Sequence, residues 1–300
     1  MSAPPRLFDR ALHRRRLGRA AAGYGGADFL KRRAAEDIVQ RLEAIQRQFP
    51  LAVDLGARNG AFARALAASD ASAKVGTLIE ADLSPAMLAG RAGPRLVLDE
   101  ERLPFADASL DLAVSSLALH WANDLVGALI QLRRALKPDG LFIGAILGGA
   151  TLTELRQALL QAEAELAPGV GPRVSPFADA YDGAALLQRA GFALPVSDVD
   201  RVTVRYAHPL KLLADLRAMG ETNVLMERPR APLTRPILAR TFEIYARKFG
   251  EGDGRILATF EIITLTGWAP HPDQQQPLKP GSAKMRLADA LGVVEHKAKR

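Results

Sequence analysis

The segment 51–60, Leu-Ala-Val-Asp-Leu-Gly-Ala-Arg-Asn-Gly, decides the fold of this 300-residue chain. Its apolar beginning, residues 51–55, predicts a short buried strand that ends directly before Gly56, and residues 60–68 predict a helix. A glycine after a strand lets a ligand approach the backbone, and the N-terminus of the following helix offers unpaired N–H groups. The segment therefore predicts a cradle for a nucleoside or a dinucleotide, although such a loop is a weak signal alone.

Strands and helices continue to alternate after this segment. Helices are predicted at 85–89 and 124–136, and the composition of residues 137–140, Lys-Pro-Asp-Gly, predicts a turn. Six further strands bring the total to seven, at 75–81, 95–98, 110–116, 141–147, 196–206 and 258–268. Strands separated by helices indicate a doubly wound, mostly parallel α/β sheet, which binds its ligands outside the carboxyl ends of the strands.

Other helices flank this alternation, at 28–48 (ended by Pro50), 151–166, 184–190, 208–220 and 236–249. The last two fall between the final two strands, where a minimal sheet needs only a hairpin. We therefore divide the chain into a basic N-terminal helical arm or lid at 1–50, a main domain at 51–268 with an insertion at about 207–255, and a C-terminal tail at 269–300. The composition of the tail predicts a mobile arm with a short helix.

The formal net charge of +7 is concentrated at the N-terminus. Residues 1–50 contain 11 arginine and lysine residues against 5 acidic ones, which leaves +6 there. Such a segment could contact an anionic membrane surface or an acidic protein, could be a transit peptide, or could be a solvated basic helix. Nucleic acid is the weakest alternative, because no pattern of aromatic residues between the basic ones supports binding of single strands.

The composition excludes several classes of protein. The chain has no cysteine, so disulfides, zinc ribbons, iron–sulfur clusters and thiol nucleophiles are excluded. A hydrophobic content of 48% with 24% charged residues is typical of a globular protein with a substantial core. The longest apolar runs, such as residues 141–147, are too short to span a bilayer, so we expect a soluble protein without a transmembrane segment.

Three aspartates come at the ends of three successive predicted strands. Asp54 ends the first strand, Asp82 follows the second and Asp99 follows the third. Carboxylates at these places can accept hydrogen bonds from a ligand ammonium, from both ribose hydroxyls and from the exocyclic amine of adenine, respectively. Each aspartate alone is more ordinary as a helix N-cap or a turn residue. Together they favour a cationic nucleoside, S-adenosylmethionine (SAM), over NAD, whose pyrophosphate they would repel.

Several segments resemble the successive motifs of class I SAM-dependent methyltransferases, namely Asp54-Leu55-Gly56 and residues 80–88, 103–105, 109–112, 119–121 and 136–140. The resemblance implies the Rossmann-like methyltransferase fold, a seven-stranded sheet with a helical insertion before the last strand. It also implies that Gly56 and Gly60 face the methionine moiety of SAM, that Asp82 holds the ribose and that Asp99 holds the adenine. We therefore expect the cofactor to be bound by Asp54, Gly56, Gly60, Asp82, Asp99 and Ser115.

A narrower resemblance covers nearly the whole chain. Phe8-Asp9-Arg10 and residues 99–101, 103–105, 114–125, 142–145, 148–156, 174–177, 219–223 and 281–283 are similar to the assembly factor five family of respiratory complex I (NADH:ubiquinone oxidoreductase) and its bacterial relatives. The malonyl-carrier-protein O-methyltransferases of biotin synthesis share the core motifs but less of the remainder. The first resemblance implies hydroxylation of an arginine in a complex I subunit, despite the methyltransferase fold. It also implies that residues 1–50 belong to the protein rather than to a cleaved leader, and we expect a bacterial cytoplasmic protein.

Position 58 departs from the pattern, because the superfamily usually has glycine where this chain has Arg58. Glycine there permits an unusual backbone angle and leaves room for the ligand. Arginine could strain the loop, point into solvent or pair with the carboxylate of SAM. Three hypotheses therefore stay open: a SAM-dependent enzyme acting on a complex I subunit, a small-molecule or carrier-protein O-methyltransferase, and a non-catalytic assembly factor with a degenerate SAM site.

Catalytic residues cannot be assigned from the sequence. Of the five histidines, only His120 falls at a strand end that faces the expected cofactor crevice. His120 and Trp121 are candidates for contact with the substrate, or equally for packing at the start of a helix. Hydroxylation by non-haem iron would need two histidines and a carboxylate on one metal, and no such local pairing exists, so we expect no metal site. Tyr24 and Phe8 could close over the cofactor as a lid or simply pack the N-terminal arm.

Overall fold

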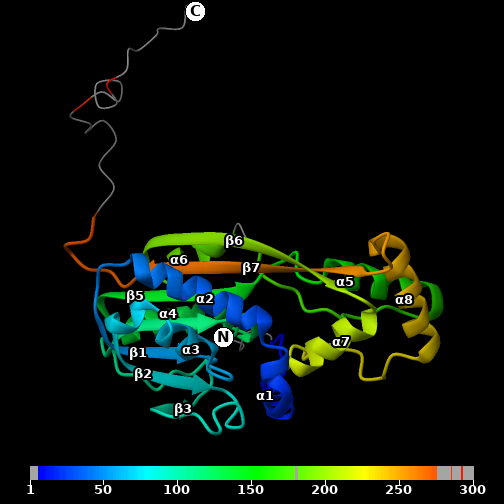
Figure 1. The fold of residues 1–300 in the computed structure, drawn as a ribbon, viewed down its shortest axis with the longest axis horizontal. Coiled ribbons are helices and arrows are strands. Elements are labelled where there is room, and N and C mark those ends of the chain that lie inside the picture. The colour runs from blue at the N-terminus through cyan, green and yellow to red at the C-terminus, as the bar shows by residue number, and fades with distance from the viewer. Residues whose placement is uncertain (1–5, 180–181, 276–284, 286–291, 293–300) are drawn as a thin grey trace, which may run out of the picture. The chain divides into compact units, whose positions relative to one another are not determined.

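A seven-stranded sheet forms the centre of the protein in a computed structural model, which describes residues 6–179, 182–275, 285 and 292. Its strands lie in the order β3-β2-β1-β4-β5-β7-β6 (Figure 1). The pairs among β1 to β5 are parallel, whereas β7 runs antiparallel to both of its neighbours. The strands are β1 (Phe49–Leu55), β2 (Val75–Asp82), β3 (Arg95–Val97), β4 (Leu110–Ser116), β5 (Leu136–Leu147), β6 (Ala193–Tyr206) and β7 (Ile256–Trp268). This arrangement confirms the predicted doubly wound, mostly parallel sheet.

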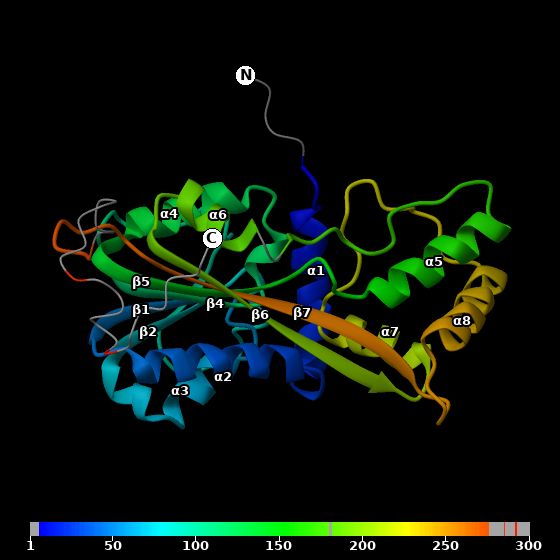
Figure 2. The same ribbon diagram turned by 90° about the horizontal axis from the view of Figure 1, so that it is seen from above.

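Helices cover both faces of the sheet, with α2 and α3 on one face and α4 and α6 on the other (Figure 2). Each face has its own buried core: the first includes Ile38 and Phe62, and the second includes Leu129 and Phe192. The α-helices are α1 (Arg10–Ala20), α2 (Phe29–Ala44), α3 (Ala61–Ala67), α4 (Leu125–Ala135), α5 (Thr153–Leu166), α6 (Gly183–Arg189), α7 (Pro209–Ala218) and α8 (Arg235–Phe249). Short 3-10 helices are η1 (Ala21–Gly26), η2 (Asp70–Lys74) and η3 (Leu119–Trp121).

The burial of the strands follows their place in the sheet. The carboxyl-terminal halves of β1 and β4, in the middle, are continuously buried. Both of their faces are covered by helices, which is why these strands are apolar runs rather than alternating patterns. β6, at the edge, mostly alternates exposed and half-buried residues, as expected for a strand with one face toward solvent. The carboxyl ends of β1, β2 and β4 therefore meet at one edge of a rigid core, where a ligand site is expected.

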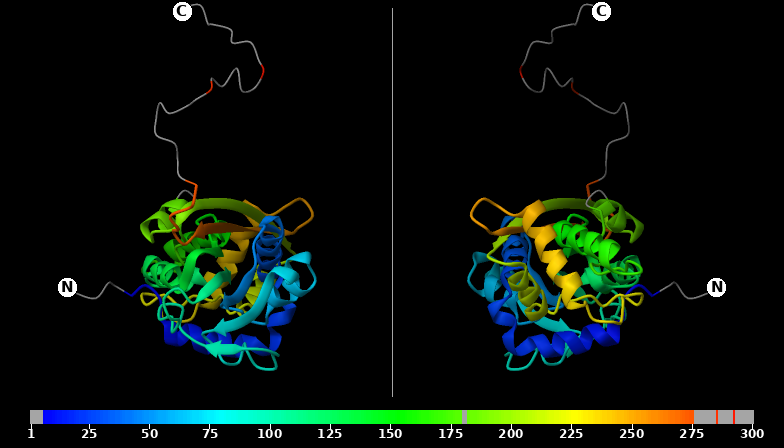
Figure 3. Two further views of the ribbon diagram at one scale, coloured as in Figure 1. Left: turned by 90° about the vertical axis from the view of Figure 1, so that its left-hand side faces the viewer. Right: turned by 90° about the vertical axis from the view of Figure 1, so that its right-hand side faces the viewer.

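The insertion before the last strand extends the molecule at one end. α7 and α8 lie between β6 and β7 in the chain, and these strands pair from Ala193 and Trp268 to Tyr206 and Ile256. α5 packs beside α8, and Figures 1 and 3 show α5, α7 and α8 gathered around the same end of the long β6–β7 pair. This confirms the helical insertion predicted before the last strand.

Some local predictions are wrong. Residues 85–89 form successive turns with hydrogen bonds between residues three apart, such as Met87 N to Ser84 O at 3.1 Å, rather than a helix. Residues 137–140 belong to β5 rather than to a turn. Asp139 does have the positive φ of a turn residue (63°), but here it causes only an irregularity in the register between β5 and β4. The helix predicted at 28–48 ends at Ala44, since β1 already begins at Phe49.

The chain divides into two compact units, Met1–Pro270 and His271–Arg300. The sheet and all the helices named above belong to the first unit. The short helix predicted for the tail falls largely outside the described residues.

Candidate functional site

The loop between β1 and α3 contains three residues with left-handed backbone angles, Gly56 (φ 68°), Arg58 (φ 52°) and Gly60 (φ 73°). A Cβ atom on Gly56 would collide with the Cβ of Ala118, so both the angle and the space require glycine there. At Gly60 the place of a Cβ atom is taken by the guanidinium of Arg91. Arg58 adopts the same class of backbone conformation without glycine's freedom, which is strained for an L-amino acid.

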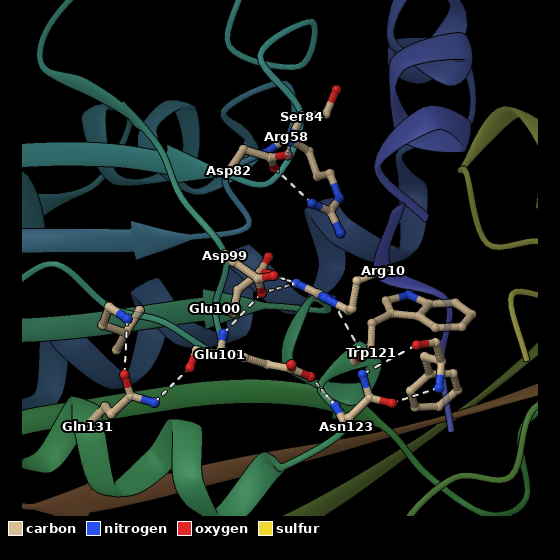
Figure 4. A network of polar contacts seen from close by, with 12 residues as sticks. Arg10, Arg58, Asp82, Ser84, Asp99, Glu100, Glu101, Trp121, Asn123 and Gln131 are labelled. Atoms are coloured by element: carbon tan, nitrogen blue, oxygen red, sulfur yellow. Dashed lines mark hydrogen bonds and ion pairs between the residues drawn. The ribbon is translucent and has the colours of Figure 1, made fainter. Parts of the chain in front are cut away.

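Arg58 turns its side chain inward onto Asp82, the aspartate at the end of β2. Its Nη1 and its backbone N–H donate to Oδ2 of Asp82 at 2.8 and 2.9 Å, and Ser84 N–H donates to Oδ1 at 2.8 Å (Figure 4). Both side chains of the pair are fully buried. Burial opposes the charge of Arg58, but the Asp82 carboxylate outweighs it and raises the arginine pKa above its ordinary value. Among the alternatives considered for Arg58, exposure to solvent is therefore wrong.

Asp99, after β3, is also engaged by an arginine of the chain itself. Arg10, at the start of α1, donates from Nη2 to Oδ1 of Asp99 at 2.8 Å and to Oε2 of Glu100 (Figure 4). Its Nη1 donates to the carbonyl of Trp121 at 3.2 Å. The side chain of Asp99 remains 33% exposed, whereas that of Glu100 is buried. The N-terminal arm is thus pinned to the carboxyl ends of the strands.

A third cation, Lys31 of α2, reaches the same edge of the sheet. Its Nζ donates to the carbonyl of Gly56 at 2.6 Å, to the hydroxyl of Ser116 at 2.9 Å and to the carbonyl of Ser116. Lys31 is 2% exposed. Burial lowers its pKa to about 8, although the nearby Asp54 carboxylate acts in the opposite direction. Three ammonium hydrogens therefore meet three oxygen acceptors that follow β1 and β4.

The remaining predicted cofactor residues, Asp54 and Ser115, are both fully buried. Neither carboxylate oxygen of Asp54 has a hydrogen-bond partner among the described residues. Burial raises the pKa of Asp54 to about 7, against the opposing charge of Lys31. The hydroxyl of Ser115 donates to the carbonyl of Leu55 at 3.0 Å and so links β4 to β1.

An aromatic cluster lies beside these pairs, centred on Trp121 of η3. The rings of Phe8 and His13 pack against its indole at centroid distances of 5.2 and 4.8 Å. The indole Nε1 donates to Oε2 of Glu221 at 2.9 Å, and Nε2 of His120 lies 3.3 Å from the same oxygen. The structure therefore brings both substrate candidates, His120 and Trp121, to one carboxylate from the loop after α7.

A small pocket, partly open to solvent, lies next to this cluster. Its walls are mainly apolar and carry one carboxylate, one ammonium and one phenol. It is lined by Tyr24, Ala27, Leu30, Lys31, Leu117, Leu147, Met219 and Glu221. Of the two aromatic residues considered as a lid, Tyr24 lines this pocket, whereas Phe8 packs against Trp121 and is not among the lining residues.

Side chains of the chain itself take part of the site expected to bind SAM. Asp82, the expected ribose acceptor, already accepts from Arg58. Lys31 takes the carbonyl of Gly56, whereas Asp54, the expected ammonium acceptor, keeps both carboxylate oxygens without a hydrogen-bond partner among the described residues. Both oxygens of Asp82 are used and buried, so ribose hydroxyls cannot reach them. Only Asp99, at the adenine position, keeps an exposed portion.

Sequence reasoning missed the partners of these acids. Arg10 and Glu221 fall within segments that carried the family resemblance, but Lys31 has no such signal. His13 was also missed: burial, and next the charge of Arg58, lower its pKa well below the ordinary value. Neither of its ring nitrogens has a hydrogen-bond partner within the described part of the chain. His13 is therefore a neutral ring at physiological pH, packed between charged neighbours.

The described residues also bear on two remaining expectations, which concern a metal site and a membrane-spanning segment. They contain no group of three or more histidine, aspartate or glutamate residues placed to hold a metal ion. Within the same residues, every helix is too short or too polar to cross a membrane.

Comparisons with known proteins agree with this architecture. Residues 53–144 match a family model described as a methyltransferase domain. The chain is 38% identical over 290 residues to the mitochondrial arginine-hydroxylase NDUFAF5 of Danio rerio, covering 94% of this chain and 89% of that protein. It is 35% identical over 269 residues to the malonyl-[acyl-carrier protein] O-methyltransferase of Halorhodospira halophila, covering 87% and 88%. The solved YcgJ protein of Bacillus subtilis aligns with a TM-score of 0.53 at 16% identity over 79% of this chain and 98% of that one, which supports the fold alone.

Proposed function

Because this chain belongs to the class I SAM-dependent methyltransferase superfamily, a family of enzymes, we propose that it modifies an arginine side chain in a protein subunit of respiratory complex I during assembly of the complex. Two observations support an arginine as substrate. One is the 38% identity to the NDUFAF5 arginine-hydroxylases over most of both chains. The other, which carries the proposal, is the pocket beside Trp121. The choice of complex I follows from the resemblance of the sequence motifs.

The pocket has the chemistry that an arginine side chain requires. Leu117, Leu147 and Met219 offer apolar wall to the three methylenes of arginine, and Glu221 offers a carboxylate to its guanidinium. Glu221 is oriented by the indole N–H of Trp121 and keeps 15% of its side chain exposed. Lys31, the cation of the lining, is engaged by backbone carbonyls, which leaves Glu221 as the group that receives a guanidinium.

Replacing Glu221 by glutamine tests this assignment. A strain that lacks the gene would be complemented with the wild type, with Glu221→Gln or with Glu227→Gln, and the complex I subunits analysed by mass spectrometry. Glu227 is an exposed glutamate of the same loop and provides a matched control. We expect the control to restore modification and Glu221→Gln to reduce it at least about tenfold, since a charge-assisted hydrogen bond is lost.

The mass added to the arginine distinguishes methylation from hydroxylation, because a methyl group and an oxygen atom differ in mass. Full modification by the Glu221→Gln variant would remove the pocket from the proposal. Unmodified arginines in the wild-type strain would remove arginine modification altogether.

We further propose SAM as the ligand of the cleft at the carboxyl ends of the strands, bound by Asp54, Gly56, Gly60, Asp82, Asp99 and Ser115. The positions of the three aspartates and the match to a methyltransferase domain support this. Bound there, SAM supplies an electrophilic methyl group. Its binding requires Arg58 and Lys31 to release the acceptors that they hold.

A carrier-protein O-methyltransferase is the second candidate, favoured by the 35% identity to the Halorhodospira halophila protein over most of both chains. Restored growth without biotin, in a strain that lacks the corresponding methyltransferase, would support this candidate. Failure to restore growth would leave the arginine-modifying enzyme as the better proposal.

A further inference from the structure

We infer that the cofactor cleft is self-occupied, because three basic side chains of the chain itself hold the polar positions that SAM needs. These side chains are Arg10, Lys31 and Arg58, and Figure 4 shows Arg10 and Arg58 directed at the carboxylates that follow β3 and β2. The inference rests on the proposed assignment of this cleft to SAM. It shares Lys31 with the pocket proposed for the arginine, but it does not depend on which substrate that pocket receives.

Lys31 holds polar backbone positions near Asp54, the carboxylate expected to receive the ligand's ammonium group. An ammonium carries hydrogens that need oxygen acceptors, and Nζ of Lys31 meets three of them: the carbonyls of Gly56 and Ser116 and the hydroxyl of Ser116. These acceptors follow the carboxyl ends of β1 and β4, beside the loop expected to face the methionine moiety. The ammonium of SAM would have the same charge and the same hydrogen-bonding capacity, so the two cations compete for one set of acceptors.

Arg58 holds the position of the ribose. Ribose hydroxyls would need the oxygens of Asp82, but Oδ2 accepts two hydrogen bonds from Arg58 and Oδ1 accepts one from Ser84. Neither side chain of the Arg58–Asp82 pair is exposed. A ribose therefore reaches Asp82 only after the guanidinium has left.

Arg10 blocks the adenine position less completely. It binds one oxygen of Asp99 and a second carboxylate, Glu100, while a third of the Asp99 side chain stays exposed. The closure thus differs between the positions. It is complete at the ribose position and partial at the adenine position, and at the ammonium position Lys31 takes the carbonyls while the oxygens of Asp54 keep no partner among the described residues. An adenine ring could make first contact without displacing a buried cation.

In the self-occupied state Arg58 neutralises the buried charge of Asp82, but some of its own donors stay without partners. Without counter-charges, Asp82 would be an uncompensated buried anion, which is costly. Arg58 provides the charge, but its Nε and Nη2 are buried and have no hydrogen-bond partner among the described residues, and its φ of 52° is strained. Because this state leaves donors unsatisfied and the backbone strained, it is one from which a ligand can expel the arginine.

Isothermal titration of the full chain with SAM and with 5′-methylthioadenosine tests the inference. The second ligand keeps the adenine and the ribose but lacks the ammonium group. Arg58→Gly should bind both ligands at least tenfold more tightly than the wild type, because the ribose position is opened. Lys31→Met should bind SAM at least tenfold more tightly but leave the affinity for 5′-methylthioadenosine unchanged.

Leu194→Gly is the matched control, since Leu194 also has a positive φ, of 50°, and is 48% exposed. It should leave both affinities unchanged, while circular dichroism verifies that each variant is folded. If Arg58→Gly does not fold, Lys31→Met alone decides between the outcomes.

Equal SAM affinity in the wild type and in the folded variants would overturn self-occupation while leaving the assignment to SAM intact. Weaker binding by the variants would overturn self-occupation as well. Failure of every variant and of the wild type to bind SAM would overturn both the inference and the cofactor assignment.

Discussion

Replacing Asp82 by asparagine should destabilise the protein strongly, because the change leaves Arg58 as an uncompensated buried charge. The two side chains are 0% exposed and their charged atoms are 2.8 Å apart. Asparagine has nearly the same size and keeps an oxygen that can accept from the backbone N–H of Ser84. The substitution therefore isolates the loss of charge from changes in packing.

The expected magnitude follows from the burial of the pair. Removing one partner of a buried ion pair costs about 3–5 kcal/mol. Since each kcal/mol lowers Tm by about 2–4 °C in a domain of roughly 150–250 residues, Asp82→Asn should lower Tm by about 6–20 °C. The double variant Arg58→Met/Asp82→Asn also removes the unpaired buried charge and should regain about half of the loss or more, because that charge is the main cost of breaking a buried pair.

Urea titration followed by tryptophan fluorescence measures these differences, supported by thermal unfolding. Asp107→Asn is the matched control: Asp107 pairs with Arg134 at 3.0 Å, but their side chains are 66% and 58% exposed. An exposed pair contributes at most about 1 kcal/mol. If Asp82→Asn changes the free energy of unfolding no more than Asp107→Asn does, Arg58 is not held in a buried pair and the self-occupied cleft is wrong.

Two further predictions concern Asp54, in β1, and Gly56, in the loop that follows this strand. Burial, opposed by Lys31, raises the pKa of Asp54 from 3.8 to about 7, so the folded protein keeps a proton that the unfolded chain loses as the pH rises through this range. As the pH rises from 3.8 to about 7, the free energy of unfolding of the wild type should therefore fall relative to that of Asp54→Asn. Urea titrations that give the two proteins parallel pH profiles would contradict this. Gly56→Ala should cost about 2–5 kcal/mol, from its positive φ and its collision with Ala118. Gly90→Ala, at φ 71° with nothing within 4 Å of the added Cβ, should cost only about 1–2 kcal/mol, and equal losses of Tm would refute the steric argument.

The sheet could be predicted from the sequence because buried parallel strands are short apolar runs separated by helices. β4 was predicted with its observed bounds, Leu110–Ser116, and the other strands within a few residues. The prediction failed where local composition and tertiary pairing disagree. Lys137–Gly140 has the composition of a turn, but Leu136 and Leu141 on either side pair with β4, and hydrogen bonds between Asp139, Gly140 and Ala269 keep the intervening residues within the strand as a bulge.

The candidate site could be predicted only in part. Asp82 and Asp99 were placed by their position after strands, since the topology fixes where strand ends lie. Their partners could not be placed, because Arg58 breaks the expected glycine pattern and Arg10 lies 89 positions from Asp99 in the sequence. Lys31 likewise lies 85 positions from Ser116. No periodicity links such pairs, so only the folded chain shows that the acids are already neutralised.

The structure shows which charges of the basic N-terminal segment have partners within the chain and which are exposed. Arg33 and Arg41 form surface ion pairs with aspartates of β6, and Arg10 and Lys31 are engaged by polar groups at the carboxyl ends of the strands, so much of the excess charge has a partner within the chain. The exposed arginines of α1 are Arg14, Arg15 and Arg19. A protein partner or an anionic surface attracted by this segment therefore meets the outer face of α1. Because the inner face of the same helix carries Arg10 against Asp99 and His13 against Trp121, binding there would act on the helix that contacts the proposed cofactor site.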